Sequence, residues 1–128
     1  MIVRSVFKIS LILILFSWFI SCKDQENNHE KHNNIKGKWD VYATEINNKQ
    51  SRNMDQAFFQ FFENGTVYSN IFADSNAYAY TLNADKLSIQ SPEPMHLMIK
   101  NLTRDSMQLE GTLRVFYMRF FLTKDHNL

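Results

Sequence analysis

The stretch Ala57-Phe-Phe-Gln-Phe-Phe-Glu-Asn-Gly-Thr-Val-Tyr-Ser69 decides the fold. Two runs rich in aromatic and β-branched residues, 57–62 and 66–72, flank the tripeptide Glu63-Asn64-Gly65. Asn-Gly between two such runs is the strongest short-range sign of a β-hairpin, because both residues readily take the positive φ angles of a tight turn. We therefore expect two antiparallel strands joined at Gly65.

Short strands and polar turns continue along the chain in the same rhythm. Further strands are expected at 39–45, 77–82, 86–90, 96–102, 107–109 and 113–123, and a polar loop is expected at 47–53. The connections leave no space for crossover helices, which favours an antiparallel meander. Eight such strands can close into a barrel that holds side chains or one small ligand. The predicted fold class is all-β: a small, eight-stranded, antiparallel up-and-down barrel.

The N-terminal residues have the pattern of a cleaved export signal. Arg4 and Lys8 precede a short apolar run at 9–20, which ends at Ser21 and Cys22 before an abruptly polar segment. The apolar run is shorter than the roughly 18 residues or more expected of a spanning helix. The predicted organisation is a signal peptide at 1–21, a modified cysteine and flexible tether at 22–34, and a β-barrel domain at 35–128.

The cysteine at this boundary carries the first family resemblance. Phe19-Ile20-Ser21-Cys22 resembles the lipobox of bacterial lipoproteins, which implies cleavage before Cys22 and its acylation by diacylglyceryl and N-acyl chains such as palmitate. An ordinarily cleaved secreted protein and an uncleaved anchor are the alternatives. The segment Lys23-Asp24-Gln25-Glu26 resembles the export signals of Bacteroidota surface lipoproteins. Both resemblances imply an outer-membrane location in the cell envelope, with the periplasmic or surface-facing leaflet left open.

The segment after Cys22, residues 23–34, has no apolar residue, so we expect a flexible coil. Cys22 is the single cysteine, which excludes an intramolecular disulfide. Because two of the 14 basic residues, Arg4 and Lys8, fall in the leader, 12 basic and 13 acidic residues remain beyond it. That balance does not favour a nucleic-acid partner, whose binding face would be strongly basic.

The start of the first strand carries a second resemblance. Gly37-Lys38-Trp39 resembles the Gly-x-Trp signature of lipocalins, and Phe62-Glu63-Asn64-Gly65-Thr66 with Tyr80-Thr81-Leu82 resembles small bacterial lipocalin-like lipoproteins. The resemblance implies that Trp39 lies at the closed end of the barrel and that an arginine of the last strand packs across it. Arg119 is the first candidate for that arginine, and Arg114 is the second.

An apolar lumen with a few tyrosine hydroxyls would suit a small hydrophobic ligand. The candidates for lining it are Tyr42, Phe61, Tyr68, Tyr78, Tyr80, Met98 and Tyr117. A barrel filled by its own side chains is the competing expectation. The four phenylalanines of 58–62 place rings on both faces of one strand, so the outward rings either pack under a loop or form an exposed apolar patch for a partner.

Other chemistry has little support in the sequence. His29 and His32 lie in the expected coil, and His96 stands near Met95 and Met98, so neither group predicts a metal site. No Ser-centred glycine elbow occurs and the acids are scattered at turns, so we expect neither an enzyme nor a cofactor. Asp105-Ser106-Met107 resembles the acceptor of Bacteroidota O-glycosylation at Ser106.

The expected function is therefore non-catalytic binding by a membrane-anchored lipoprotein. Its barrel would bind a small apolar molecule or an envelope component. The alternative is an inhibitor or assembly module that binds a protein, keeps its barrel filled and has no small-molecule ligand. Fold alone does not separate the two, because barrels of this kind serve carriers and inhibitors alike.

Overall fold

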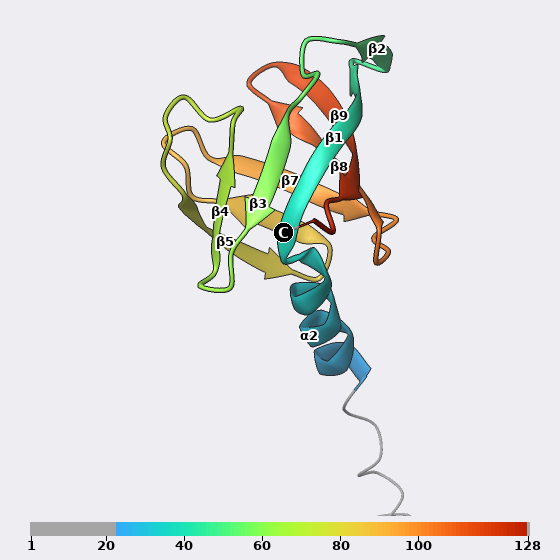
Figure 1. Ribbon diagram of the computed structural model, residues 1–128, viewed down its shortest axis with the longest axis vertical. Helices are drawn as coiled ribbons and strands as arrows, with labels where there is room; N and C mark the ends of the chain where they lie inside the picture. Colours follow the sequence, from blue (N-terminus) through green and yellow to red (C-terminus); the bar gives the residue numbers. More distant parts are fainter. Residues whose placement is uncertain (1–22, 128) are drawn as a thin grey trace, which may run out of the picture.

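The structure, a computed structural model, describes residues 23–127. Its elements are α2 (Lys23–Ile35), β1 (Gly37–Ile46), β2 (Lys49–Ser51), β3 (Phe58–Phe61), β4 (Thr66–Ser69), β5 (Tyr78–Asn83), β6 (Lys86–Ile89), β7 (Met95–Lys100), β8 (Ser106–Leu113) and β9 (Phe116–Lys124). Every strand from β3 to β9 pairs antiparallel with its neighbour in sequence, and β1 pairs with both β3 and β9. The expected eight-stranded antiparallel up-and-down barrel is confirmed (Figure 1).

The hairpin from which the prediction began has the expected geometry. Gly65 has φ +79°, and the Asn64 side chain accepts hydrogen bonds from the backbone N–H and the hydroxyl of Thr66. The register pairs Phe61 with Val67 and Phe59 with Ser69. All four of these residues are buried, so the turn directs one face of the hairpin into the barrel.

Two tight turns that were not expected from the sequence make the observed strands differ from the predicted ones. Asn47 and Asn48 both have positive φ, and they fold β2 back onto the end of β1 where a plain loop was expected. Arg114 also has positive φ, at 57°, in the turn that separates β8 from β9. The strand expected at 113–123 therefore begins only at Phe116, and the one expected at 107–109 extends to Leu113.

The segment expected to be a flexible coil is instead the helix α2, which projects from one end of the barrel (Figure 1). Tertiary contacts hold its last turns there: Ile35 is fully buried, Lys31 pairs with Asp85 at 2.5 Å, and the His32 ring lies 3.2 Å from the Leu82 carbonyl. Within residues 23–127, no helix is both long and apolar enough to cross a bilayer.

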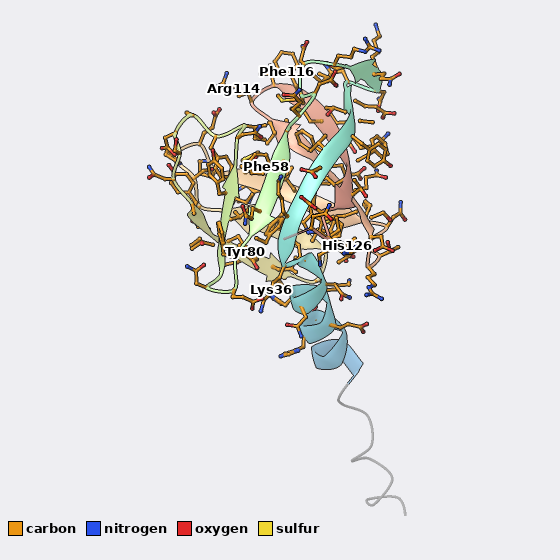
Figure 2. The ribbon with its side chains drawn as sticks, viewed as in Figure 1. Lys36, Phe58, Tyr80, Arg114, Phe116 and His126 are labelled. Carbon is orange, nitrogen blue, oxygen red and sulfur yellow. The ribbon has the colours of Figure 1, made fainter. Side chains whose placement is uncertain are left out.

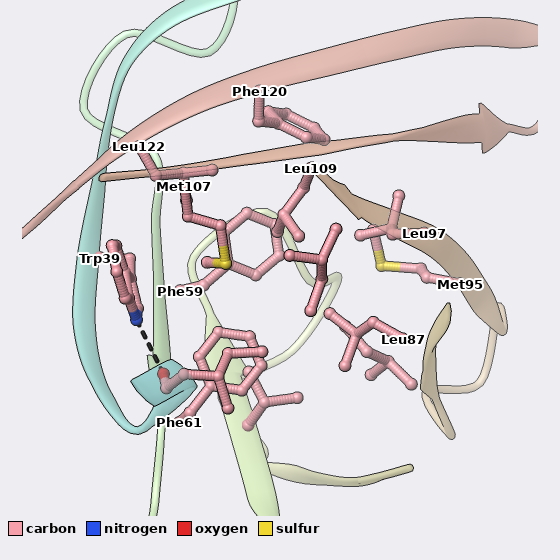
Figure 3. Close-up of a cluster of buried hydrophobic side chains, with 14 of the residues drawn as sticks. Trp39, Phe59, Phe61, Leu87, Met95, Leu97, Met107, Leu109, Phe120 and Leu122 are labelled. Atoms are coloured by element: carbon pink, nitrogen blue, oxygen red, sulfur yellow. Dashed lines mark hydrogen bonds between the residues drawn. The ribbon is translucent and has the colours of Figure 1, made fainter. Parts of the chain in front are cut away.

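The interior of the barrel is packed with apolar side chains through most of its length (Figure 3). Phe59 packs edge-on against Phe120 at 5.7 Å, and Phe61 packs edge-on against Tyr80 at 5.2 Å. Aromatic pairs in this arrangement add about 0.5–1.5 kcal/mol beyond the area they bury. Most of the barrel interior is therefore occupied by the protein's own side chains.

Candidate ligand-binding site

A cavity of about 580 Å³ occupies the end of the barrel opposite α2. The end of β1, the start of β5 and the loops that follow β2, β4, β6 and β8 surround it. Figure 2 shows Arg114 and Phe116 at this end, whereas Lys36 lies at the helical end. We call this space the mouth cavity; its lining consists of Ile46, Asn53, Met54, Ile71, Phe72, Ala73, Asp74, Tyr78, Ser91, Pro92, Glu93, Pro94, Met95, Leu113, Arg114, Phe116 and Met118.

The walls of the mouth cavity are mainly apolar. Met95 and Met118 are buried at its base, and Ile71 and Phe72 are half-buried in the loop between β4 and β5. Phe116, at the start of β9, keeps 47% of its surface exposed. An apolar space of this volume, with a few polar groups, is typical of sites for small molecules, which commonly measure about 300–1,000 Å³.

One polar group in the lining is a carboxylate held by its neighbours. Asp74 accepts a hydrogen bond from the Tyr78 hydroxyl through one oxygen and from the Asn76 backbone N–H, at 3.0 Å, through the other. The bond from Tyr78 is the main cause of a lowered pKa at Asp74, and the same bond raises the pKa of Tyr78. Asp74 is therefore ionised at neutral pH, and its phenol partner is protonated.

The second polar group is an ion pair. The Arg114 guanidinium donates from Nε to both carboxylate oxygens of Glu93, at 3.0 and 3.3 Å, and from Nη2 to one of them at 3.2 Å. The pair joins the loop after β6 to the turn after β8. Arg114 is the one cation in the lining, and Glu93 already compensates its charge.

The opposite end of the barrel is closed around Trp39, the tryptophan of the Gly37-Lys38-Trp39 sequence. Trp39 is fully buried, and its indole Nε1–H donates to the Ile35 carbonyl at 2.7 Å (Figure 3). The cation over the indole is Lys124, whose Nζ lies 5.2 Å from the ring centroid, so the prediction of Arg119, or secondarily Arg114, was wrong. Gly37 has φ +111°, and a Cβ there would lie 3.0 Å from Lys124 Cε.

Arg119 lies on the outer face because inward positions on β9 are Met118, Phe120 and Leu122. There it pairs with Glu45 of β1 at 2.6 Å and with Glu110 of β8 at 3.2 Å. The three side chains stand directly opposite one another across three adjacent strands. Arg119 thus links strands at the barrel closure and takes no part in closing its end.

Strand parity divides the seven predicted lining residues. Those facing inward are Phe61, Tyr78 and Tyr80, and those on the outer face are Tyr42, Tyr68, Met98 and Tyr117. Phe61 and Tyr80 belong to the packed core, so Tyr78 alone among the seven lines the mouth cavity. Tyr42, at 66% exposed, is on the outside because it alternates with the inward-facing Trp39 and Val41 of β1.

The phenylalanine-rich strand does not form an exposed patch. Phe59 and Phe61 are buried inside, and Phe58 is half-buried outside against Tyr68, with ring centroids 5.6 Å apart. Lys38 Nζ covers the Phe58 ring at 5.0 Å. The outward ring of Phe58 is therefore packed, but against side chains of the neighbouring strands β4 and β1 rather than under the loop that was expected.

Most residues of the mouth cavity escaped the sequence analysis. Phe72, Asp74 and Glu93 lie in loops, and nothing in their local sequence shows that these loops meet. The order of the strands in a meander offered one signal, because alternate loops of an up-and-down barrel lie at the same end. Applied to the predicted strands, that rule places the loops at 73–76 and 91–95 together.

The remaining predicted sites have separate positions. Ser106 is exposed at the start of β8, and its Oγ lies 2.8 Å from Thr103 Oγ1; its glycosylation stays a prediction. His96 faces outward beside Ser88, whereas Met95 faces inward. Within the described residues, no three His, Cys, Asp or Glu side chains are grouped as metal ligands. Cys22 lies outside the described residues.

Comparisons with protein families, with curated proteins and with solved structures find no match to this chain.

Proposed function

We propose that this protein is a non-enzymatic outer-membrane lipoprotein, anchored through acylated Cys22, whose lipocalin-like barrel binds a small apolar molecule in the mouth cavity. The observation that carries the proposal is the cavity itself: about 580 Å³ at one end of a small antiparallel barrel, with methionine, isoleucine and aromatic walls. A fully filled barrel would offer no such volume. The lipid anchor rests on the lipobox resemblance at 19–22.

The experiment uses the Cys22→Ser chain, which cannot be acylated at that residue. Native mass spectrometry should detect a co-purified apolar molecule, and the neutral dye N-phenyl-1-naphthylamine should bind with increased fluorescence. Ile71→Trp and Met54→Trp fill the cavity from two different loops, and each should weaken dye binding by about tenfold or more, since apolar contacts in small sites depend on fit.

Val115→Trp is the matched control. It adds the same ring at the same end of the barrel, but Val115 is 81% exposed and does not line the cavity, so dye affinity should stay unchanged. Absence of any co-purified molecule, together with dye binding that neither filling variant weakens, would refute the carrier function.

A second function, docking of a protein partner, is favoured by the tip of the β8–β9 hairpin. Val115 and Phe116 are exposed there, next to each other at the end of the barrel. A partner that covered these two side chains would remove apolar surface from water. Val115→Asp should then abolish capture of an envelope protein while leaving dye affinity unchanged; capture by the variant at the native level would exclude this function.

A further inference from the structure

The polar groups of the mouth cavity indicate the chemical class of the ligand's head, an inference that rests on the binding function proposed above. Asp74 and Glu93 carry two negative charges in the lining, and Arg114 carries one positive charge. Arg114 is bonded to Glu93 through three contacts of 3.0, 3.3 and 3.2 Å. The lining as a whole is therefore net negative.

Asp74 carries a negative charge that no cationic side chain of the described residues neutralises. Its partners, the Tyr78 hydroxyl and the Asn76 backbone N–H, are neutral donors. In the part of the chain that the structure describes, no lysine, arginine or histidine forms an ion pair with Asp74. The two hydrogen bonds fix the carboxylate in place and leave its charge uncompensated.

Aromatic rings stand next to this carboxylate. Phe72 packs edge-on against Tyr78, with centroids 5.5 Å apart, and both residues line the cavity with Asp74. Phe116 lines it from the opposite hairpin. Aromatic faces beside a fixed carboxylate attract ammonium groups, because the ring face has a negative electrostatic potential and the carboxylate supplies a full negative charge.

We infer that the mouth cavity selects amphiphiles with an apolar body and a cationic, ammonium-type head, held at Asp74, Tyr78 and Phe72. The apolar body lies against Ile71, Met95 and Met118. A carboxylate or sulfate head would meet Asp74 as a like charge, and the positive charge of Arg114 is already paired with Glu93. Anionic amphiphiles such as fatty acids are therefore disfavoured.

The test compares three amphiphiles that share the same ten-carbon tail and differ only in the head group. Decyltrimethylammonium, decanol and decanoate, each below its micelle concentration, are titrated as competitors of bound N-phenyl-1-naphthylamine on the Cys22→Ser chain. The cation should compete about tenfold better than the alcohol, and the carboxylate should compete worst. Added salt should narrow the difference between the charged heads.

Asp74→Asn keeps the side-chain shape and removes the charge. The preference for the cation should fall to near equality with the alcohol, while affinity for the neutral dye stays at the native level and reports that the cavity is intact. Glu63→Gln changes an exposed carboxylate at the closed end, paired with Lys36, and should have no effect.

The outcomes separate the two proposals. Dye binding with equal competition by the three heads, or a cation preference that survives Asp74→Asn, would overturn the inference and leave the carrier function standing. Absence of both a co-purified molecule and specific dye binding would overturn both.

Discussion

At the scale of the residue, Gly37, Trp39 and Lys124 form one unit at the closed end. The positive φ of Gly37 turns the chain into β1, and its missing Cβ leaves space for the Lys124 stem. That stem carries Nζ over the indole and on to the Asn34 carbonyl at 3.2 Å. Burial, followed by the charge of Arg104, lowers the pKa of Lys124, whereas Asp105 opposes the shift. Both Gly37 and Trp39 of the Gly-x-Trp sequence therefore have a physical role at this end of the barrel.

Two substitutions at Trp39 separate packing from hydrogen bonding. Trp39→Ala should lower the free energy of unfolding by about 3–5 kcal/mol, because it empties a fully buried site. Trp39→Phe keeps an aromatic ring but leaves the Ile35 carbonyl without its donor, at a cost of about 1–3 kcal/mol. Urea unfolding followed by circular dichroism measures both. A loss under about 1 kcal/mol for Trp39→Ala would show that the indole is peripheral to stability.

The sequence predicted Gly37 and Trp39 but missed the cation above the ring. Residues 116–122 alternate inward and outward on β9, which puts Arg119 outside and Lys124 at the closed end. The alternation of inward and outward residues can be seen in the sequence. The turn at Arg114 cannot, and a single strand was therefore expected from 113 to 123. That turn requires a positive φ at a residue that is neither glycine nor asparagine, so local sequence gives no sign of it.

At the scale of the element, β1, β9 and β8 are joined on the outer face by Glu45, Arg119 and Glu110. Burial raises the pKa of Glu110, but hydrogen bonds from Arg119, Tyr117 and Gln108 outweigh it, and the net pKa is lowered from 4.5. A carboxyl whose pKa is lower in the folded state stabilises the fold above its unfolded value. That contribution is lost as the pH falls through the lower, folded value.

Glu110→Gln tests this assignment. The native protein should lose stability as the pH falls below 4.5, the ordinary pKa of the carboxyl, and the variant should lose less, because the glutamine does not titrate. Urea midpoints at each pH give the two profiles. Glu63→Gln, at an exposed position on a turn, is the control and should follow the native profile. Parallel profiles for Glu110→Gln and the native chain would contradict a role for this carboxylate.

The helix α2 shows where element prediction failed. Its residues are polar apart from the last, Ile35, and composition alone favours a solvated coil. Its anchoring contacts join residues some 50 positions apart, such as Lys31 with Asp85 and His32 with the Leu82 carbonyl. Contacts so distant in sequence cannot be read from a local pattern. The strands were predicted more accurately than the helix because turn residues and apolar runs are local signals.

At the scale of the whole molecule, α2 and the mouth cavity lie at opposite ends of the barrel. The helix begins at the residue after Cys22, and its 13 residues extend about 20 Å at 1.5 Å per residue. A lipid on Cys22 would therefore place the closed end toward the bilayer and leave the cavity accessible from the aqueous side. This arrangement suits exchange of ligand with a soluble or envelope partner.

Cys22→Ala tests the anchor on which this orientation depends. The variant should move from the membrane fraction to the soluble fraction and should not incorporate radiolabelled palmitate, because the acylated thiol is gone. Ser21→Ala, which keeps a small residue before the cysteine, should still be labelled. Full labelling of Cys22→Ala would exclude acylation at this site.

The pairing of β1 with β9 sets the order in which the chain can fold. The register joins Trp39 to Lys124 and Ile46 to Met118, so the barrel closes only when its first and last strands meet. Contacts between such distant segments form slowly compared with local hairpins. A chain threading through a translocation channel cannot close this barrel until Lys124 has emerged. The interior of the barrel is therefore enclosed only after the last strand is available to pair with the first.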